Sequence, residues 1–455
     1  MMVQQRRPRT RPGKTGARAV STLFLVAMLA ACGPPAGRGM EALTGATVVD
    51  VITGRSLPNA VVLVRDGRIV AIGGATEFNI PRGATITELR QRWIIPGLID
   101  AHADLQPWGL ANSLRYGVTA VRDLHDAPAM VDTVRRMTVG GPAPHLFFAS
   151  ALFDEPPLTN LDAVEISAPE QSAAAVEAVA SSAASWVLTY THVTPPILES
   201  IVLESRLRHL PVAAHLGLTD ALTAARLGVT TIEHLSGVPE AAGDSASLFE
   251  AHRLGLLRGW TAFERSWSQL DTTTLASVAR DLAARGVLLV PTLVRHETFS
   301  RLDDSAMYRT PELAGVPDSA RANWNVKAMI RRAGLTRRDY PLLRSGRVKQ
   351  DFFVHAFVKA GGRVAAGTNT PAPLVVPGAA VHTEMELLVH AGLSPLEALR
   401  AATLWSAEML HADSLGQLRA GATADLVVLG ASPLADIRNS REIVRVMLHG
   451  KWLPR

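Results

Sequence analysis

The chain has 455 residues, of which 47% are hydrophobic and 19% charged, as is typical of a folded protein and not of a disordered one. This length suits two or three domains, or one barrel with an accessory domain. Residues 1–31 hold six Lys or Arg and no acidic residue, and without them the formal net charge of +5 becomes −1. Because the rest of the chain is nearly neutral, its charge argues against nucleic acid as a partner.

Residues 1–31 have the layout of an export signal. A basic start leads into the apolar stretch Ala19–Ala31, which at about 13 residues is too short to span a bilayer as a helix. The stretch ends in LAAC at Cys32, which resembles the lipobox of bacterial lipoproteins, where the signal is cleaved before a cysteine that is then acylated. We therefore predict a signal peptide (1–31), lipidation of Cys32 and a Pro/Gly-rich tether (32–40). The protein would then lie in the cell envelope, at the outer membrane facing the periplasm if the cell is Gram-negative.

Short strand patterns occur at both ends of the remaining chain. The segment Ala46–Gly74 is rich in Val and Ile, and its Asp66-Gly67 pair lies between two apolar runs, as in a β-hairpin. A similar pattern of short, Val- and Leu-rich runs recurs in Ala424–Gly430 and Arg441–Leu453. These patterns predict one small β domain assembled from residues 41–93 and 413–455.

Between these ends, apolar strand-like runs alternate with helical stretches, which is the pattern of a parallel α/β fold. Eight such runs fit a (β/α)8 barrel over residues 94–412, with its chemistry at the carboxyl ends of the strands. The Arg-rich stretch 301–350 is long for a barrel loop and predicts a helical lid. The strand candidates are Ile94–Ala101, Val118–Asp123, His145–Ala149, Trp186–Tyr190, Pro211–His215, Thr230–His234, Val287–Pro291 and Gly362–Gly367.

Two polar side chains follow the first apolar run. His102 and Asp104 are two positions apart, so on a strand they point to the same face. An imidazole and a carboxylate side by side are suitable ligands for a divalent metal such as zinc. Cys32 is the single cysteine of the chain, so a disulfide within the chain and a cysteine metal site in the fold are both excluded.

Several motifs, taken in order, resemble the amidohydrolase superfamily, in particular its imidazolonepropionase and Xaa-Pro dipeptidase-like branch. The resemblance extends from about Ala46 to Trp452, and it implies a distorted (β/α)8 barrel beside a β-sandwich. It also implies one or two divalent metals that activate water for hydrolysis of amide or other C–N bonds. The motifs are PGLIDAHAD (Pro96–Asp104), GVTAVRDL (Gly117–Leu124), PVAAH (Pro211–His215), GVTTIEH (Gly228–His234), AAGTN (Ala365–Asn369) and the signature from His382 to Leu410.

The resemblance assigns roles to single positions, and three of them are altered. His102, His215 and His234 stand where the family has metal-ligating histidines, whereas Asp104 replaces a further histidine. Leu188 occupies the position of the lysine that, once carboxylated, bridges two metals. Asn369 occupies the position of the aspartate that takes a proton from the attacking water.

These substitutions differ in chemical weight. The carboxylate of Asp104 is still a metal ligand, and it is a substitute for the base missing at Asn369. The hydrocarbon side chain of Leu188 cannot bridge two metals, so a binuclear centre is not expected. Asn369 offers a neutral amide that cannot accept a proton near neutral pH. The ligand set His102, Asp104, His215 and His234 is therefore compatible with one divalent ion, zinc or similar, or with none.

Three functions remain open at this point. The first is an altered, mononuclear hydrolase acting on C–N bonds of a small cyclic amide or dipeptide. The second is a non-catalytic lipoprotein that binds a ligand or partner at the barrel mouth. The third is another chemistry at the mouth, such as an isomerase or lyase with a rebuilt site.

The remaining polar residues receive plainer interpretations. By strand alternation Glu233 should point away from the face of its neighbour His234. His192 shares the parity of Leu188 and Tyr190, so it is either a replacement ligand or a surface histidine. Seven further histidines lack ligand spacing and are expected to be structural or solvated: His145, His252, His355, His382, His390, His411 and His449.

Overall fold

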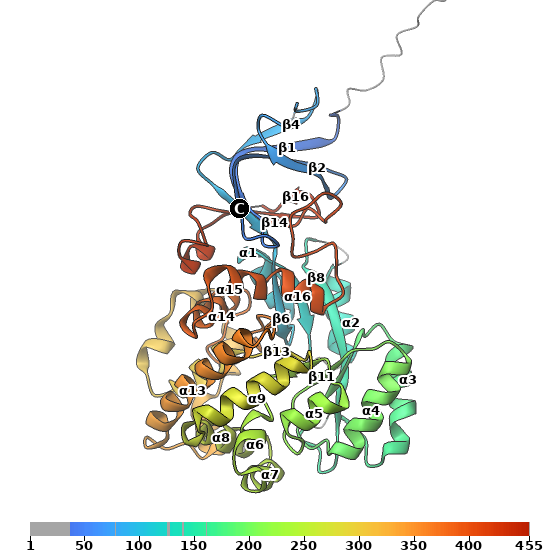
Figure 1. The fold of residues 1–455 in the computed structure, drawn as a ribbon, viewed down its shortest axis with the longest axis vertical. Helices are drawn as coiled ribbons and strands as arrows, with labels where there is room; N and C mark the ends of the chain where they lie inside the picture. Colours follow the sequence, from blue (N-terminus) through green and yellow to red (C-terminus); the bar gives the residue numbers. More distant parts are fainter. Residues whose placement is uncertain (1–36, 78, 125–127, 139–140, 161, 455) are drawn as a thin grey trace, which may run out of the picture.

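The computed structural model describes residues 37–454 apart from 78, 125–127, 139–140 and 161 (Figure 1). The predicted signal peptide and Cys32 therefore lie outside the described residues. Within the described part of the chain, no helix combines the length and the apolar character needed to cross a membrane. The fold has two parts, a small β domain at one end and a larger α/β body below it (Figure 1).

The small domain is one mixed sheet of strands from both ends of the chain, in the order β16-β15-β14-β5-β1-β2-β3, with β4 paired to β1. The turn between β2 and β3 is formed by Asp66 and Gly67, whose φ values of 51° and 76° suit a tight hairpin turn. The prediction of a small β domain shared by the two chain ends is confirmed. The strands are β1 (Met40–Val49), β2 (Ser56–Arg65), β3 (Arg68–Gly74), β4 (Thr85–Glu88), β5 (Trp93–Pro96), β14 (Leu426–Leu429), β15 (Ile443–Leu448) and β16 (Lys451–Trp452).

The second sheet is the parallel barrel predicted for the middle of the chain. Its seven strands follow the order β13-β12-β11-β10-β8-β7-β6, and β9 pairs with β8 outside the ring. Its strands are β6 (Leu98–Ala103), β7 (Val118–Asp123), β8 (His145–Asp154), β9 (Val164–Glu165), β10 (Trp186–Thr189), β11 (Val212–Ala214), β12 (Thr231–Glu233) and β13 (Leu288–Val290).

Two of the predicted barrel strands were wrong in detail. The first is divided at Gly97: β5 pairs with β14 in the small domain, and β6 enters the barrel. A Cβ at Gly97 would lie 2.1 Å from the Thr119 hydroxyl oxygen, so only glycine fits where the chain passes between the sheets. The eighth strand is reduced to isolated bridges, Leu289 with Val364 and Ala103 with Thr370, which still close the ring.

Helices surround the barrel strands (Figure 1). The stretch 301–350 is largely helical, from η3 (Ser305–Arg309) to the first half of α13 (Asp339–Lys359). The α-helices are α1 (Pro107–Arg115), α2 (Pro128–Thr138), α3 (Ser172–Ala180), α4 (Pro195–Leu207), α5 (Ala221–Leu227), α6 (Val238–Ala242), α7 (Ser245–Arg253), α8 (Leu256–Ser266), α9 (Thr272–Ala284), α10 (Leu293–Ser300), α11 (Asp318–Ala322), α12 (Val326–Ala333), α13 (Asp339–Lys359), α14 (Ala379–His390), α15 (Pro395–Ala401) and α16 (Leu404–Met409). The 3-10 helices are η1 (Pro169–Gln171), η2 (Trp267–Gln269), η3 (Ser305–Arg309), η4 (Pro311–Gly315) and η5 (Ile437–Arg441).

Candidate metal centre at the barrel mouth

Three histidines lie together at the carboxyl ends of β6, β11 and β12. The ring centroids of His102 and His234 are 4.4 Å apart, and those of His234 and His215 are 4.8 Å apart. Tyr190 continues the row at 4.5 Å from the ring of His215. The structure therefore brings together the three histidines that the sequence singled out, at the end of a barrel where such proteins carry their chemistry.

A buried ion pair orients His102. Its Nδ1 lies 2.7 Å from Oε2 of Glu233, whose Oε1 accepts a hydrogen bond of 2.7 Å from the guanidinium of Arg122. A carboxylate can only accept, so His102 donates from Nδ1 and keeps a lone pair on Nε2. Both Glu233 and Arg122 have fully buried side chains. This is how a carboxylate fixes the tautomer of a metal-ligating histidine.

The pKa of Glu233 reflects this pairing. Burial alone would raise it, but the charge of Arg122 and the hydrogen bond from His102 outweigh burial and hold the pKa below its ordinary value. Arg122 in turn donates from Nε to the carbonyl of Ala101 at 2.6 Å, and its guanidinium carbon lies 4.5 Å from the ring centre of Trp186. Glu233 is therefore a fixed anion behind His102.

The expectation that Glu233 points away from the mouth was wrong. Strand β12 ends at Glu233, and the next two residues, His234 and Leu235, have φ values of 59° and 56°. These left-handed conformations break the alternation of side chains that holds within a strand. Glu233 and His234 consequently both contribute to the mouth, one behind His102 and one beside it.

His234 is held as a neutral base. Its Nδ1 forms a hydrogen bond of 2.8 Å with the hydroxyl of Thr292. Burial, followed by the nearby charges of His102 and His215, lowers its pKa well below 6.5. Neutral imidazole is the form that ligates a metal, so His234 fits a metal site.

Asn369 faces His102 directly. It lies in a left-handed turn with φ 54°, and its Nδ2 is 3.2 Å from Nε2 of His102. The amide donates to the same lone pair that a metal would use. An aspartate at this position would offer no N–H for this contact.

Leu188 lies in the apolar cluster that also contains Leu152, Trp186, Ala213 and Val290. Its side chain is buried, and it is paired in register with Ala213 of β11. Since Tyr190, two positions on, reaches His215, Leu188 lies one layer below the mouth. A hydrocarbon side chain offers no atom that can ligate a metal.

Asp104 lies just beyond the end of β6, close enough to Tyr190 and Arg295 to affect both. Burial, and then the charge of Asp104, raise the pKa of Tyr190. Burial lowers the pKa of Arg295, while Glu264 and Asp104 act in the opposite direction. Asp104 therefore lies at the mouth close to Arg295, which the sequence did not single out.

Neither interpretation of His192, as a replacement ligand or as a surface histidine, is correct, because the residue is buried. Its Nδ1 lies 2.7 Å from the carbonyl of Pro157, and its Nε2 lies 3.0 Å from the carbonyl of His252. Both nitrogens thus face acceptors, and neither presents a lone pair to a metal. Its role is structural.

Among the described residues, one group of three His, Cys, Asp or Glu has ligand atoms that all lie within 4.8 Å of one another, and it lies away from the mouth: His145, Asp425 and His449. At the mouth the rings are close, but the ligand atoms do not converge to that degree. A metal at the mouth therefore requires a side-chain adjustment, of which the exchange of the Asn369 contact with His102 is one part.

Parallel barrels of this class carry their functional site at the carboxyl ends of the strands, which is where the three histidines lie. The chain belongs to the amidohydrolase family, whose model matches residues 93–453. The family resemblance and the fold class deduced from the motifs are thereby confirmed.

Known proteins extend this comparison. Ochratoxinase from Aspergillus niger is 38% identical over 88 residues, which is 19% of this chain and 17% of that protein. Among solved structures, bottromycin amidohydrolase is 24% identical with a TM-score of 0.70, covering 91% of this chain and 87% of its own. A Xaa-Pro dipeptidase with bound methionine in its active site is 16% identical with a TM-score of 0.66, covering 91% and 99%. These structural likenesses show a shared fold.

Proposed function

We propose that this chain hydrolyses a C–N bond of a small amide or dipeptide, using one divalent metal ion such as zinc held at the barrel mouth by His102, His215 and His234. The observation that carries this proposal is the oriented row of histidines, in which Glu233 and Arg122 fix the tautomer of His102. A buried ion pair is costly to desolvate, and orientation of a ligand is a role that explains why this one is present.

Each residue of the mouth would have a separate role in hydrolysis. A divalent ion there supplies Lewis-acid polarisation of a carbonyl and lowers the pKa of water. His102 presents Nε2, and His234 is kept neutral by burial. Asp104 is the substitute base, since Asn369 cannot take a proton. Without a dedicated base at position 369, we expect turnover about 10²–10⁴-fold below that of a site with one.

Arg295 supports a substrate with a free carboxylate. Its Nη1 is buried and has no hydrogen-bond partner within the described part of the chain. A buried guanidinium N–H without a partner is costly, and a carboxylate is the group that matches its geometry. The similar structures include a Xaa-Pro dipeptidase, whose name fits a substrate of this kind. We therefore favour a dipeptide or N-acyl amino acid over a neutral cyclic amide.

The test is a hydrolysis panel on the untagged chain supplied with zinc. It pairs Xaa-Pro dipeptides and N-acyl amino acids with the corresponding C-terminal amides, and it includes cyclic amides. Turnover of the carboxylates, lost in His215→Ala and kept in His411→Ala, is expected. A rise in KM of about tenfold or more for Arg295→Met, with the amides unaffected, would support the role of Arg295. Absence of turnover for every compound would contradict the proposal.

Ligand binding without turnover is the second candidate, and one observation favours it. Asn369 already donates to the lone pair of His102, and Leu188 offers no bridging ligand, so His102 is hydrogen-bonded at both ring nitrogens without a metal. This candidate predicts that the same carboxylates bind by calorimetry, that Arg295→Met weakens binding, and that none of them is cleaved.

We also propose that the chain is anchored in the cell envelope by lipid on Cys32, with no nucleic acid among its partners. The LAAC sequence and the nearly neutral charge beyond residue 31 support this. Labelling with a fatty-acid analogue should be present in the natural chain and absent in Cys32→Ser. Equal labelling of both chains would contradict it.

A further inference from the structure

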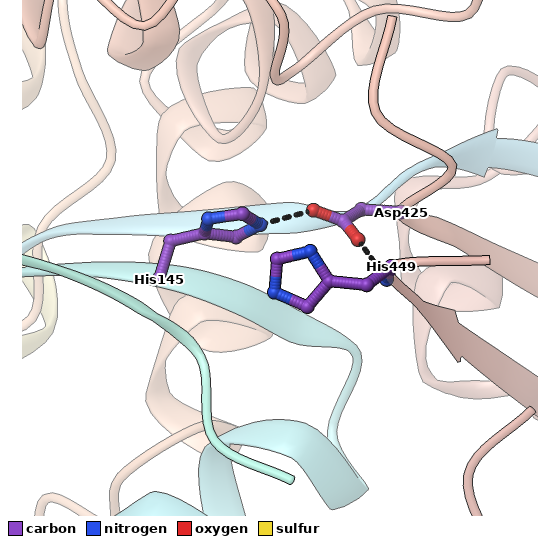
Figure 2. A group of neighbouring side chains, drawn as sticks. All are labelled: His145, Asp425 and His449. Carbon is purple, nitrogen blue, oxygen red and sulfur yellow. Dashed lines mark hydrogen bonds and ion pairs between the residues drawn. The ribbon is translucent and has the colours of Figure 1, made fainter. Parts of the chain in front are cut away.

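A second group of metal-ligating side chains lies far from the mouth, where the barrel meets the small domain. His145 is the first residue of β8 and so lies at the amino end of the barrel. Asp425 immediately precedes β14, and His449 occupies the turn between β15 and β16. Figure 2 shows the three side chains converging from these separate segments. Their spacing along the chain does not indicate a metal site, because only the fold brings them together.

The contacts within this group are short. Nε2 of His145 lies 2.6 Å from Oδ2 of Asp425, and the rings of His145 and His449 have centroids 4.4 Å apart. The backbone N–H of His449 donates to the other oxygen of Asp425, Oδ1, at 2.6 Å (Figure 2). The carboxylate is thus fixed by the turn that carries His449, while Oδ2 stays directed toward the imidazoles.

These distances suit a small divalent ion. One ligand atom from each residue lies within 4.8 Å of the other two. Nitrogen and oxygen ligands of a tetrahedral zinc, at 2.0–2.1 Å from the metal, are about 3.3 Å apart. The separation of 2.6 Å between Nε2 of His145 and Oδ2 of Asp425 is below that value, so an ion requires these two atoms to move apart by about 0.7 Å.

The backbone at His449 is a separate observation. Its φ of 50° places a residue with a Cβ in the left-handed region, and Gly450 follows with φ 72°. Asn or Asp is the usual residue before glycine in such a hairpin turn. Left-handed non-glycine residues concentrate at ligand-binding positions, and here the conformation directs an exposed imidazole to a buried carboxylate.

The surroundings keep the group accessible. The side chain of Asp425 is 4% exposed and that of His145 is 23% exposed, and a cavity of about 440 Å³ lined in part by Arg135, Leu448 and His449 opens beside them. Burial, followed by the charge of His145, lowers the pKa of His449, with Lys451 adding to the effect and Asp425 opposing it. The partial exposure of His145 and the cavity beside the group leave it within reach of an ion from solvent.

We propose that His145, Asp425 and His449 form a binding site for one zinc-like divalent ion that fastens the small domain to the amino end of the barrel. Two imidazoles and one carboxylate are a ligand set of zinc and similar transition metals, with a fourth position open toward solvent. Since the three ligands come from β8, the start of β14 and the β15–β16 turn, the ion would link segments 280 or more residues apart in the chain. This site is independent of the mouth and of hydrolysis.

The experiment is a zinc titration of the untagged, metal-depleted chain, followed by calorimetry and by thermal unfolding. His449→Asn removes the imidazole but keeps a residue that tolerates the left-handed turn. His411→Asn is the matched control, because His411 is an exposed histidine with φ 52° outside the group. Each change is also made in His215→Ala, so that zinc at the mouth is counted separately.

We expect His449→Asn to lower the affinity for one equivalent of zinc by at least about 10–100-fold, both in the natural chain and in His215→Ala. It should also abolish a zinc-dependent rise in Tm. His411→Asn should change neither, and His145→Gln should repeat the effect of His449→Asn if the latter fails to fold. Unchanged zinc affinity and an unchanged zinc-dependent Tm in both His449→Asn and His145→Gln would show that the group is an ion pair only.

Discussion

The buried pair of Arg122 and Glu233 gives the sharpest prediction about stability. In Arg122→Met the side-chain volume is nearly kept, but Glu233 loses its cationic partner and retains hydrogen bonds only from Thr231 and His102. Because both side chains are fully buried, water cannot replace the guanidinium. Breaking a buried pair in this way costs about 3–5 kcal/mol of unfolding free energy.

Removing both partners should cost less than removing one. In Arg122→Met/Glu233→Met no unpaired charge remains, and replacement of a buried pair by apolar groups is often close to neutral. We therefore expect the double variant to recover at least about 1 kcal/mol relative to Arg122→Met, although His102 loses its hydrogen-bond acceptor.

The assay is urea unfolding followed by fluorescence, with the midpoint and the slope fitted together. Arg438→Met is the control, because Arg438 forms an exposed ion pair with Asp436, and its midpoint should stay close to that of the natural chain. A loss below about 1 kcal/mol in Arg122→Met, or a double variant less stable than the single one, would refute the account of this pair.

Three further predictions concern single positions. Burial, and then the charge of Arg441, lower the pKa of His382 from 6.5 to about 4. As the pH falls from 6.5 toward 4, the unfolded chain takes up a proton at this position before the folded chain does, so the free energy of unfolding is highest above pH 6.5 and decreases over this range. His382→Gln should flatten this part of a profile of urea midpoint against pH. Leu188→Lys should lower the unfolding free energy by at least about 2 kcal/mol, whereas Leu188→Met should cost under about 1.5, both by urea unfolding. Asn369→Asp should raise kcat by about 10²–10⁴-fold on any substrate of the panel, and an unchanged kcat would mean that Asp104 already acts as an efficient base.

The sequence predicted most of the fold because strand and helix patterns are local. The alternation of apolar runs with helices indicated the barrel, and the hairpin signal at Asp66 indicated the small domain. The division of the first strand at Gly97 was not visible, since it depends on a contact with Thr119 from the next strand. The eighth strand was overestimated because its residues close the ring through isolated bridges.

The candidate site was predicted less completely. The positions of His102, His215 and His234 could be identified because each ends a strand in a recognisable motif. Glu233 was misplaced, since alternation was applied across a residue that leaves the strand with φ 59°. Arg122 and Arg295 were missed because an arginine carries no local sign in the sequence that its guanidinium will be buried. Partners such as Asp425 and His145, 280 residues apart, are set by tertiary structure and have no signal in sequence spacing.

The central claim is that the barrel mouth holds one metal ion despite the altered positions 104, 188 and 369. The most direct measurement is anomalous diffraction at the zinc edge from crystals of the untagged chain grown with zinc. The account predicts a peak within bonding distance of His102, His215 and His234, and no second peak beside Leu188. A crystal with zinc bound at other positions and none at the mouth, with Asn369 still bonded to His102, would contradict it.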